Sequence, residues 1–235
     1  MHPAPAETDL VELVIPCLNE EVALPALLAA VPSGWTVIVV DNGSVDNTAG
    51  VARSAGATVV HEPQPGYGAA VHRGLRAATR DIVVVLDGDG SIRPGDLAAM
   101  VEVVTGGRAD LCCGTRQPVT SPAWPLHARW GNRVLAAALS VALGFPLHDI
   151  APVRVARRAA LLELGVTDRR FGYPLETLLR ARAAHWRIVE HPIPYHPRNG
   201  GQSKVTGSIR GTVRALRDFA GVLLANRELL WGRAG

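Results

Sequence analysis

The feature that most constrains this chain is an unbroken apolar run at residues 82–86 that stops at two acids, Asp87 and Asp89, separated by Gly88. Five consecutive apolar residues rich in β-branched side chains predict a strand buried on both faces. Such strands belong to mainly parallel sheets, whose ligands lie beyond the carboxyl ends of the strands. The two carboxylates are therefore predicted to lie at a binding site.

Asp87 and Asp89 repel each other unless a positive charge lies between them, and Arg93 is the only cation nearby in the sequence. A divalent ion, Mg²⁺ or Mn²⁺, would satisfy both carboxylates, and Gly88 would let the backbone approach a diphosphate. Taken alone, Asp-Gly-Asp is more often a polar turn, because turn geometry selects the same residues. The rest of the chain favours the metal site.

Apolar runs alternate with helical patterns along the chain, which predicts a doubly wound, mainly parallel α/β sheet flanked by helices. The further runs occur at residues 10–16, 35–40, 57–60, 110–114 and 187–195. We expect a single domain over residues 1–235, with residues 1–9 as a disordered lead and 208–235 as an amphipathic C-terminal helix. Asn19 and Asp46 are placed to cap the helices that follow the first two strands.

Three of the predicted strands end in carboxylates: Glu20 after the first, Asp41 after the second, and Asp87 with Asp89 after the fourth. Individually, Glu20 could stabilise a helix dipole and Asp41 could form an Asx turn. Because the carboxyl ends of parallel strands meet at one edge of a sheet, three such endings together predict a binding site there.

Several functional classes are disfavoured. The formal charge of +3 comes from scattered basic residues, so no nucleic-acid groove is indicated. Residues 16–21, after the first strand, contain no glycine, which argues against a dinucleotide-binding turn, and no Walker glycine-lysine loop occurs. A small phosphate-bearing ligand remains compatible with the composition.

The cysteines Cys17, Cys112 and Cys113 lie in or beside apolar strand patterns, which predicts buried thiols in a reducing compartment. The first residues lack the basic and apolar regions of a signal peptide. No apolar run reaches the roughly 18–20 residues that cross a bilayer. We therefore expect a cytoplasmic protein without a transmembrane segment.

Two later segments carry cations. A long helix is predicted at residues 126–143, with Arg129 and Arg133 in its first turns and an apolar stretch that suits a core helix better than a membrane-facing one. A glycine-rich loop at residues 196–207 contains Arg198 and Lys204, and such loops can close over a phosphate. By itself, that loop is more often merely flexible.

These motifs, in this order and spacing, resemble the family 2 glycosyltransferases with a GT-A-like fold. The closest resemblance is to the dolichol-phosphate mannose synthase branch, which loads a sugar onto a polyprenyl phosphate. The resemblance covers the chain after residue 10 and is carried by residues 15–21, 39–48, 66–70, 86–90 and 198–208.

The resemblance implies specific roles. Pro16, Leu18, Glu20 and Asp41 would hold the nucleoside of a GDP- or UDP-sugar donor, and Asp87 and Asp89, with Gly88 between them, would bind a divalent metal on its diphosphate. Arg198 and Lys204 would lie over that diphosphate. Arg116, with Arg129 or Arg133, would receive the acceptor phosphate. Asp89, Arg116 and Lys204 are the predicted catalytic residues.

The sequence departs from the family pattern at Leu18, which replaces an aromatic residue, and at Ser91, which stands where many relatives have a glutamine metal ligand. Of the usual motif around residues 148–154, only Asp149 and Arg154 remain, and His148 could be a third metal ligand or a base, although a single loop histidine is more often solvated or hydrogen-bonded. The sugar, the nucleotide base and the acceptor therefore stay open.

The implied reaction is metal-dependent, inverting sugar transfer to a polyprenyl phosphate, at the inner face of a membrane to which the enzyme is peripheral. A phosphate acceptor is already an anionic nucleophile and needs no strong base. A hydroxyl acceptor would need one, and Asp149 or Glu176 would be the candidates. The remaining alternatives are a soluble phosphate acceptor, a nucleotidyltransferase, and a non-catalytic sugar-nucleotide-binding module.

Lys204 is the only lysine among 24 basic residues. A compact ammonium on a flexible stem can approach a crowded diphosphate as a point charge, whereas a planar guanidinium needs more room. We predict that Lys204→Met loses most turnover and that Lys204→Arg restores only part of it. Full activity of Lys204→Met at saturating donor, with an unchanged melting temperature, would remove Lys204 from the site.

Overall fold

The computed structural model of the chain describes residues 11–120, 133, 136–137, 139–140, 144, 146–150, 152–198 and 209–228. Its strands are β1 (Val11–Cys17), β2 (Thr36–Asp41), β3 (Thr58–His61), β4 (Ile82–Val85), β5 (Leu111–Pro118), β6 (Arg154–Arg157) and β7 (Ile188–Tyr195). Its helices are α1 (Leu24–Ala29), α2 (Thr48–Ser54), α3 (Tyr67–Ala77), η2 (Pro94–Leu97), α4 (Ala98–Thr105), α6 (Arg158–Glu163), α7 (Tyr173–Ala183) and α8 (Ile209–Ala225).

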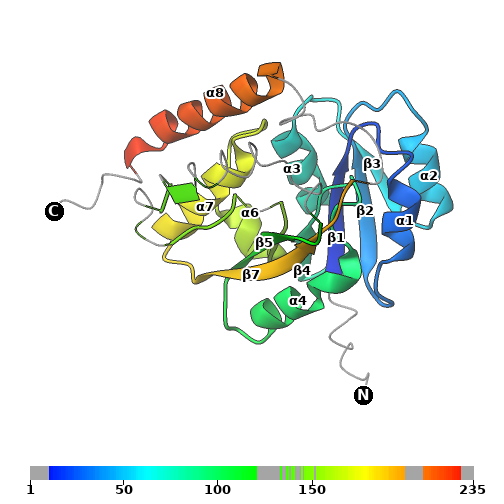
Figure 1. Ribbon diagram of the computed structural model, residues 1–235, viewed down its shortest axis with the longest axis horizontal. Helices are drawn as coiled ribbons and strands as arrows, with labels where there is room; N and C mark the ends of the chain where they lie inside the picture. Colours follow the sequence, from blue (N-terminus) through cyan, green and yellow to red (C-terminus); the bar gives the residue numbers. More distant parts are fainter. Residues whose placement is uncertain are drawn as a thin grey trace.

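All of these strands form one seven-stranded sheet in the order β3-β2-β1-β4-β6-β5-β7 (Figure 1). Every neighbouring pair is parallel except β4–β6 and β5–β6, so β6 alone runs in the opposite direction. The predicted doubly wound, mainly parallel sheet is confirmed. The reversal of β6 brings its amino end to the edge where the other strands have their carboxyl ends.

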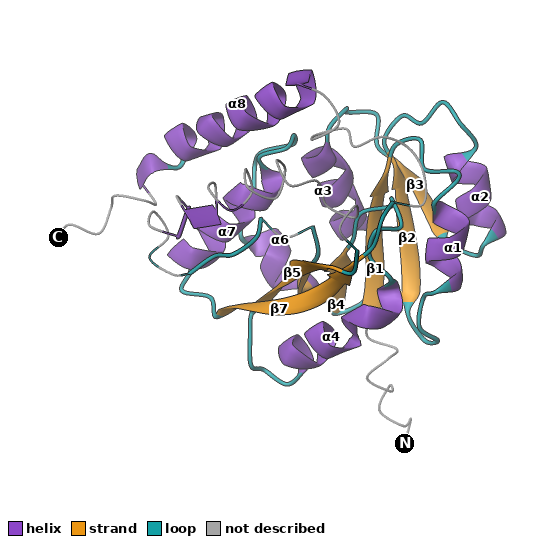
Figure 2. Ribbon diagram, in the orientation of Figure 1, coloured by secondary structure: helices purple, strands orange, loops and turns teal. Residues whose placement is uncertain are grey.

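Helices cover both faces of the sheet, as Figure 2 shows. Alternation along β4 explains why both are needed: Ile82 and Val84 face the core that contains α1 and α4, whereas Val83 and Val85 face the core that contains α3 and α7. All four side chains are at most 2% exposed. The sequence signal for a strand buried on both faces is therefore confirmed.

The observed boundaries differ from the prediction where pairing decides them. The fifth strand, expected at 110–114, continues to Pro118 because β5 pairs with β7 residue by residue from Leu111 to Pro118. The predicted helix at 126–143 lies mostly outside the described residues; the described ones at 133, 136–137 and 139–140 are helical. The predicted lead at residues 1–9 also lies outside them.

The cysteines are buried and free, as expected, and burial raises the pKa of Cys112 to about 12. The C-terminal helix α8 lies on the outer side of α7, where Val222 enters the core. Within the described ranges no helix is both long enough and apolar enough to cross a membrane. The single-domain organisation stays a prediction.

A substitution at Gly74 tests how closely α3 packs on the sheet. A β-carbon there would lie 2.3 Å from Cγ1 of Val14 and 2.9 Å from Cγ2 of Val40. We predict that Gly74→Ala costs about 1–3 kcal/mol of folding free energy, because overpacking outweighs the better helix propensity of alanine. Gly221→Ala in α8, where nothing lies within 4 Å, is the matched control and should be neutral or stabilising in thermal unfolding. Equal melting temperatures for the two variants would contradict this packing.

Candidate functional site

The acids predicted to converge do lie at one edge of the sheet. β1, β2 and β4 are adjacent and parallel, so the turns at their carboxyl ends are neighbours. A β-carbon on Gly88 would lie 2.7 Å from Sγ of Cys17 and 3.6 Å from Cγ of Glu20. Gly88 is therefore glycine because the turn after β4 passes directly against the turn after β1, which brings Glu20 beside the Asp87–Asp89 pair.

The turns after β1 and β2 are locked together by side chains. Asn19 accepts a hydrogen bond from the Val45 amide at Oδ1, 2.8 Å away, and donates its own amide to Oγ of Ser44. Its φ is +56°, and α1 begins only at Leu24, so the predicted helix cap at Asn19 is wrong. Asparagine tolerates this left-handed conformation, and the tertiary contact with the next turn decides its role.

Asp41 is buried at the end of β2. Its Oδ1 accepts the Ser44 amide at 3.0 Å, and its Oδ2 lies 3.1 Å from Nδ1 of His61. Arg53 Nη2 lies 3.1 Å from the other ring nitrogen of His61. Because a guanidinium only donates, that nitrogen accepts and Nδ1–H donates to Asp41. Both oxygens of Asp41 are thus held in a fixed orientation at this edge of the sheet.

Asp46 has a different role from a simple cap. Its Oδ1 accepts the amide of Thr48, the first residue of α2, and its Oδ2 accepts the amide of Glu21 at 3.2 Å. The predicted contact with the start of the helix is therefore present. The same carboxylate also ties the turn after β1 to α2, and the hydrogen bonds, led by that of Thr48, outweigh burial and lower its pKa.

Asp89 lies where the turn after β4 meets the segment after β7. Its Oδ1 accepts the Ser91 amide at 2.9 Å, and its Oδ2 forms an ion pair with Nη2 of Arg198 at 2.9 Å. The amide of His196 donates to the Ser91 carbonyl at 2.8 Å. The segment after β7 is thereby fastened over the Asp-Gly-Asp turn, and Arg198 lies where its charge reaches both carboxylates.

Asp87 lies in a less balanced environment. Burial, followed by repulsion from Asp89, raises the pKa of Asp87 to about 7. Three guanidinium groups oppose this shift without cancelling it, namely Arg198, Arg116 and Arg154. The phenol of Tyr67, whose pKa is raised mainly by its own burial, hydrogen-bonds to Asp87 and must be the donor.

Arg154 is a residue that the family resemblance placed in the motif but to which the sequence assigned no role. It is 4% exposed, and within the described part of the chain its buried Nε and Nη2 have no hydrogen-bond partner. It reaches this edge because β6 runs antiparallel and starts there. A guanidinium with two unpartnered nitrogens, whose charge acts on Asp87, gives the site cationic capacity suited to an anionic ligand.

The donor set fits a divalent metal only together with a ligand. Within the described residues no three His, Cys, Asp or Glu side chains gather closely enough to hold a metal by themselves. Asp87 and Asp89 offer hard carboxylate oxygens, and diphosphate oxygens and water would complete the shell of Mg²⁺ or Mn²⁺. His148 does not join them, because it pairs with Glu190 at 2.6 Å.

Arg116 and Asp149 form the second half of the site. Asp149 is 2% exposed and accepts from Arg116 three times: from the backbone amide at 3.0 Å, from Nε at 2.8 Å and from Nη2 at 2.6 Å. Arg116 also lies over the ring of Tyr195, 5.6 Å from its centre. Asp149 is committed to orienting Arg116, which argues against its use as the base considered for a hydroxyl acceptor.

Glu176 is equally committed. It is 1% exposed and accepts the amides of Thr167 and Asp168 and the Nε–H of Arg180 at 2.6 Å. These hydrogen bonds outweigh the effect of burial and lower its pKa. Glu176 is therefore a structural anchor of the loop before α7, and the second base considered for a hydroxyl acceptor lacks support.

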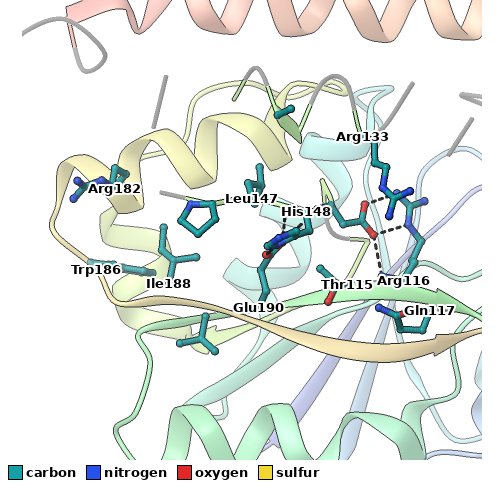
Figure 3. Close-up of a pocket in the computed structure, with 14 residues that line it drawn as sticks. Thr115, Arg116, Gln117, Arg133, Leu147, His148, Arg182, Trp186, Ile188 and Glu190 are labelled. Atoms are coloured by element: carbon teal, nitrogen blue, oxygen red, sulfur yellow. Dashed lines mark hydrogen bonds and ion pairs between the residues drawn. The ribbon is translucent and has the colours of Figure 1, made fainter. Parts of the chain in front are cut away.

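A cavity of about 1090 Å³ opens beside Arg116. In Figure 3, Arg116 and Arg133 lie together at one end, while Trp186, Ile188 and Arg182 lie toward the other. The whole lining consists of Thr115, Arg116, Gln117, Arg133, Ala137, Pro146, Leu147, His148, Asp149, Arg182, Trp186, Ile188, Val189 and Glu190. The cavity thus has Arg116 and Arg133 at one end and, toward the other, a mixed wall in which apolar side chains stand beside Arg182.

The remaining predicted site residues are placed as follows. Pro16 and Leu18 are partly exposed at the end of β1, beside the edge that carries Asp41. Arg129 and Lys204 lie outside the described residues. Tyr67, His61 and Glu190 were missed, and no local pattern marks them, because each reaches the site from a different strand or helix through tertiary packing.

Two carboxylates at the edge of a mainly parallel sheet lie near Arg116, which also lines the cavity with Arg133 and Arg182. Sheets of this class bind their ligands at the carboxyl ends of the strands. The model of the family described as glycosyl transferase family 2 matches residues 12–165, which is more than half of the chain. The chain therefore belongs to this family and is a glycosyltransferase, as its motifs predicted.

An uncharacterized glycosyltransferase of Mycobacterium tuberculosis (strain ATCC 25618 / H37Rv) is 56% identical over 211 residues, covering 90% of this chain and 96% of that protein. The dolichyl-phosphate hexose transferase of Haloferax volcanii is 31% identical over 196 residues, covering 82% and 85%. Its name agrees with the predicted branch of the family.

The fold also resembles solved structures. Glucosyl-3-phosphoglycerate synthase from Mycobacterium tuberculosis, in complex with Mn²⁺, uridine diphosphate and glucosyl-3-phosphoglycerate, superposes with a TM-score of 0.72 at 23% identity. The match covers 96% of this chain and 85% of that one. The predicted GT-A-like α/β fold is confirmed.

The raised pKa of Asp87 predicts how stability depends on pH. An unfolded chain releases this proton near its ordinary pKa of 3.8, whereas the folded protein holds it up to about 7. The stability of the metal-free protein should therefore fall as pH rises between these values and stay lower above them. We predict that Asp87→Asn, which removes the charge, raises the metal-free melting temperature at pH 8 and changes it less at pH 5.

Asp110→Asn is a control for which we expect the opposite change in melting temperature at pH 8. Hydrogen bonds from Arg187 lower the pKa of Asp110, so its charge stabilises the folded state at pH 8 and its loss should lower the melting temperature there. A decrease in both variants at pH 8 would contradict the electrostatic strain assigned to Asp87.

Proposed function

We propose that this chain transfers a sugar, with inversion, from a nucleotide-sugar donor to the phosphate of a polyprenyl phosphate, with a divalent metal held by Asp87 and Asp89. One observation carries this proposal. Arg116 lines the cavity and also lies near enough to Asp87 to lower its pKa, so the metal edge and the cavity meet at one guanidinium.

The donor would bind across the edge formed by β1, β2 and β4. The turn around Pro16, Leu18 and Glu20, together with Asp41, would hold the nucleoside of a GDP- or UDP-sugar. Asp41 is suited to this because His61 and Ser44 fix its orientation. Gly88, between the two metal ligands of this proposal, leaves room for the turn after β1 and so keeps Glu20 beside them.

Arg198 would change partners when the donor binds. Without ligand it neutralises Asp89. If a metal ion engaged that carboxylate, the same guanidinium would be available to the diphosphate, and Lys204 would join it from the residues that follow. The metal supplies Lewis-acid stabilisation of the departing nucleoside diphosphate, a role supported by the Mn²⁺ and uridine diphosphate in the structurally similar synthase.

The acceptor side explains why no base is needed. A phosphate is already charged, so the protein must hold two anions near each other without letting repulsion dominate. Arg116, fixed by Asp149, and Arg133 would bind the acceptor phosphate at the cationic end of the cavity. In-line attack by that phosphate on the donor's anomeric carbon inverts its configuration.

The cavity wall favours a lipid tail on that phosphate. Beyond Arg116 and Arg133 lie Ala137, Pro146, Leu147, Trp186 and Ile188, which, beside Arg182, offer apolar surface to an acceptor larger than its phosphate. The similarity to a dolichyl-phosphate hexose transferase supports the same acceptor class. We also propose that residues 1–235 act as one glycosyltransferase domain, peripheral to the inner face of a membrane where such a lipid resides.

A donor and acceptor panel tests the proposal. GDP-mannose, UDP-glucose and UDP-galactose are each incubated with Mg²⁺ or Mn²⁺ and with farnesyl phosphate, farnesol or 3-phosphoglycerate, and the sugar product is followed by mass spectrometry. We expect transfer to farnesyl phosphate only and none in excess chelator. Transfer to farnesol or 3-phosphoglycerate alone would refute the acceptor class.

Variants test the assignment of residues. Asp89→Asn should lower turnover by about 10²-fold or more, since it removes charge from the metal site while keeping its size. Arg133→Ala should raise the KM for farnesyl phosphate about tenfold. Arg108→Ala, an equally exposed arginine before the amino end of β5, is the matched control and should leave both KM values unchanged.

A further inference from the structure

Glu190, on β7, was not singled out in the sequence. Its carboxylate lies in the wall of the cavity and its side chain is 14% exposed. Oε1 accepts two consecutive backbone amides, from His148 at 2.9 Å and from Asp149 at 3.3 Å, while Oε2 lies 2.6 Å from Nδ1 of His148. One carboxylate therefore fixes both the backbone and the side chain of the turn at residues 148–149.

Side-chain contacts hold that turn in place. Residues 146–150 belong to no helix or strand, so no ladder of backbone hydrogen bonds sets their position. Ser140 holds one end, because its Oγ accepts the Leu147 amide at 2.8 Å. Glu190 holds the other end, directly at Asp149. The Asp149 carboxylate is thus positioned by the Arg116 amide and, through the turn, by a side chain from a distant strand.

Asp149 in turn fixes the orientation of the Arg116 guanidinium. Its two oxygens engage Nε and Nη2, which fixes the plane of the guanidinium as well as its distance. A guanidinium recognises a phosphate through directed N–H groups, so a rotated plane loses affinity even though the charge remains. The contacts form a continuous series from Glu190 through the 148–149 turn to Arg116.

We propose that Glu190 is a positioning residue for the acceptor: by holding the 148–149 turn it sets the orientation in which Arg116 meets the acceptor phosphate. This inference rests on the proposed function for the identity of the acceptor. The positioning of Arg116 by Glu190 is independent of that identity and is measurable in the protein without any acceptor.

Glu12 provides a matched control. It also accepts two consecutive backbone amides, from Thr79 at 2.6 Å and from Arg80 at 3.3 Å, but it lies near the amino end of β1, at the opposite edge of the sheet. Glu12→Gln and Glu190→Gln therefore weaken similar hydrogen bonds in places with different consequences. Glu190→Ala extends the series by removing the acceptor oxygens altogether.

The first experiment follows the Nε–H signal of Arg116 by proton–nitrogen NMR, assigned by its loss in Arg116→Lys. In the unaltered protein this N–H is bound to Asp149 and should exchange slowly with solvent. We expect exchange to quicken in Glu190→Gln, to quicken further in Glu190→Ala, and to stay unchanged in Glu12→Gln. An Arg116 signal that is unaffected in both Glu190 variants would overturn the proposal.

The second experiment measures kinetics with farnesyl phosphate and the donor that the unaltered enzyme uses. Glu190→Ala should raise the KM for farnesyl phosphate about tenfold and leave the donor KM within about twofold, as expected when an outer partner of a binding residue is lost. Glu190→Gln should lie between, and Glu12→Gln should change neither. Equal increases in both KM values would indicate a merely structural role and refute the proposal.

The two experiments separate this inference from the proposed function. If the unaltered enzyme transfers no sugar to farnesyl phosphate, the proposed acceptor class fails, and the NMR series still decides whether Glu190 orients Arg116. If transfer occurs and the NMR signal and the KM values of the Glu190 variants match the unaltered enzyme, the acceptor class stands and the positioning role fails.

Discussion

Two carboxylates on one tight turn cannot both remain charged at a covered sheet edge without positive charge beside them. Asp87 and Asp89 meet this constraint by drawing guanidinium groups from three separate strands or loops toward β4. Arg198 makes the direct ion pair, and the Ser91–His196 backbone contact fastens its segment in place. The constraint therefore determines how the end of β7 meets the middle of the sheet.

Among the described strands, β6 alone is antiparallel to its neighbours, and it separates this edge of the sheet into two parts. On one side, β1, β2 and β4 end in the turns that carry Glu20, Asp41 and the Asp87–Asp89 pair. On the other side, β5 and β7 supply Arg116 and Glu190 to the cavity. The strand β6, which lies between β4 and β5, starts with Arg154. Because β6 runs backwards, a cation from a strand start and acids from strand ends share one surface.

Several acids of the described chain hold the backbone of a loop in place. Asp46, Glu176 and Glu190 each accept backbone amides of a loop that has no ladder of its own. Such loops need side-chain acceptors, since an unpaired backbone N–H that is shielded from water costs free energy. An acid is a good candidate for a general base only when its oxygens are free of such hydrogen bonds. This argues against Asp149 and Glu176 as the base.

The sequence by itself determined the alternating architecture and the edge where the site lies, because a strand buried on both faces and acids at strand ends are local patterns. Through the family resemblance it also singled out Asp87, Asp89, Arg116 and Arg198, which the fold brings to one edge of the sheet. Only the tertiary structure decided that Asn19 links two turns instead of capping a helix, that β5 extends to Pro118, and that Asp149 binds the guanidinium of Arg116. These outcomes depend on contacts between residues more than 20 positions apart, and local propensity carries no information about which distant group will supply the partner.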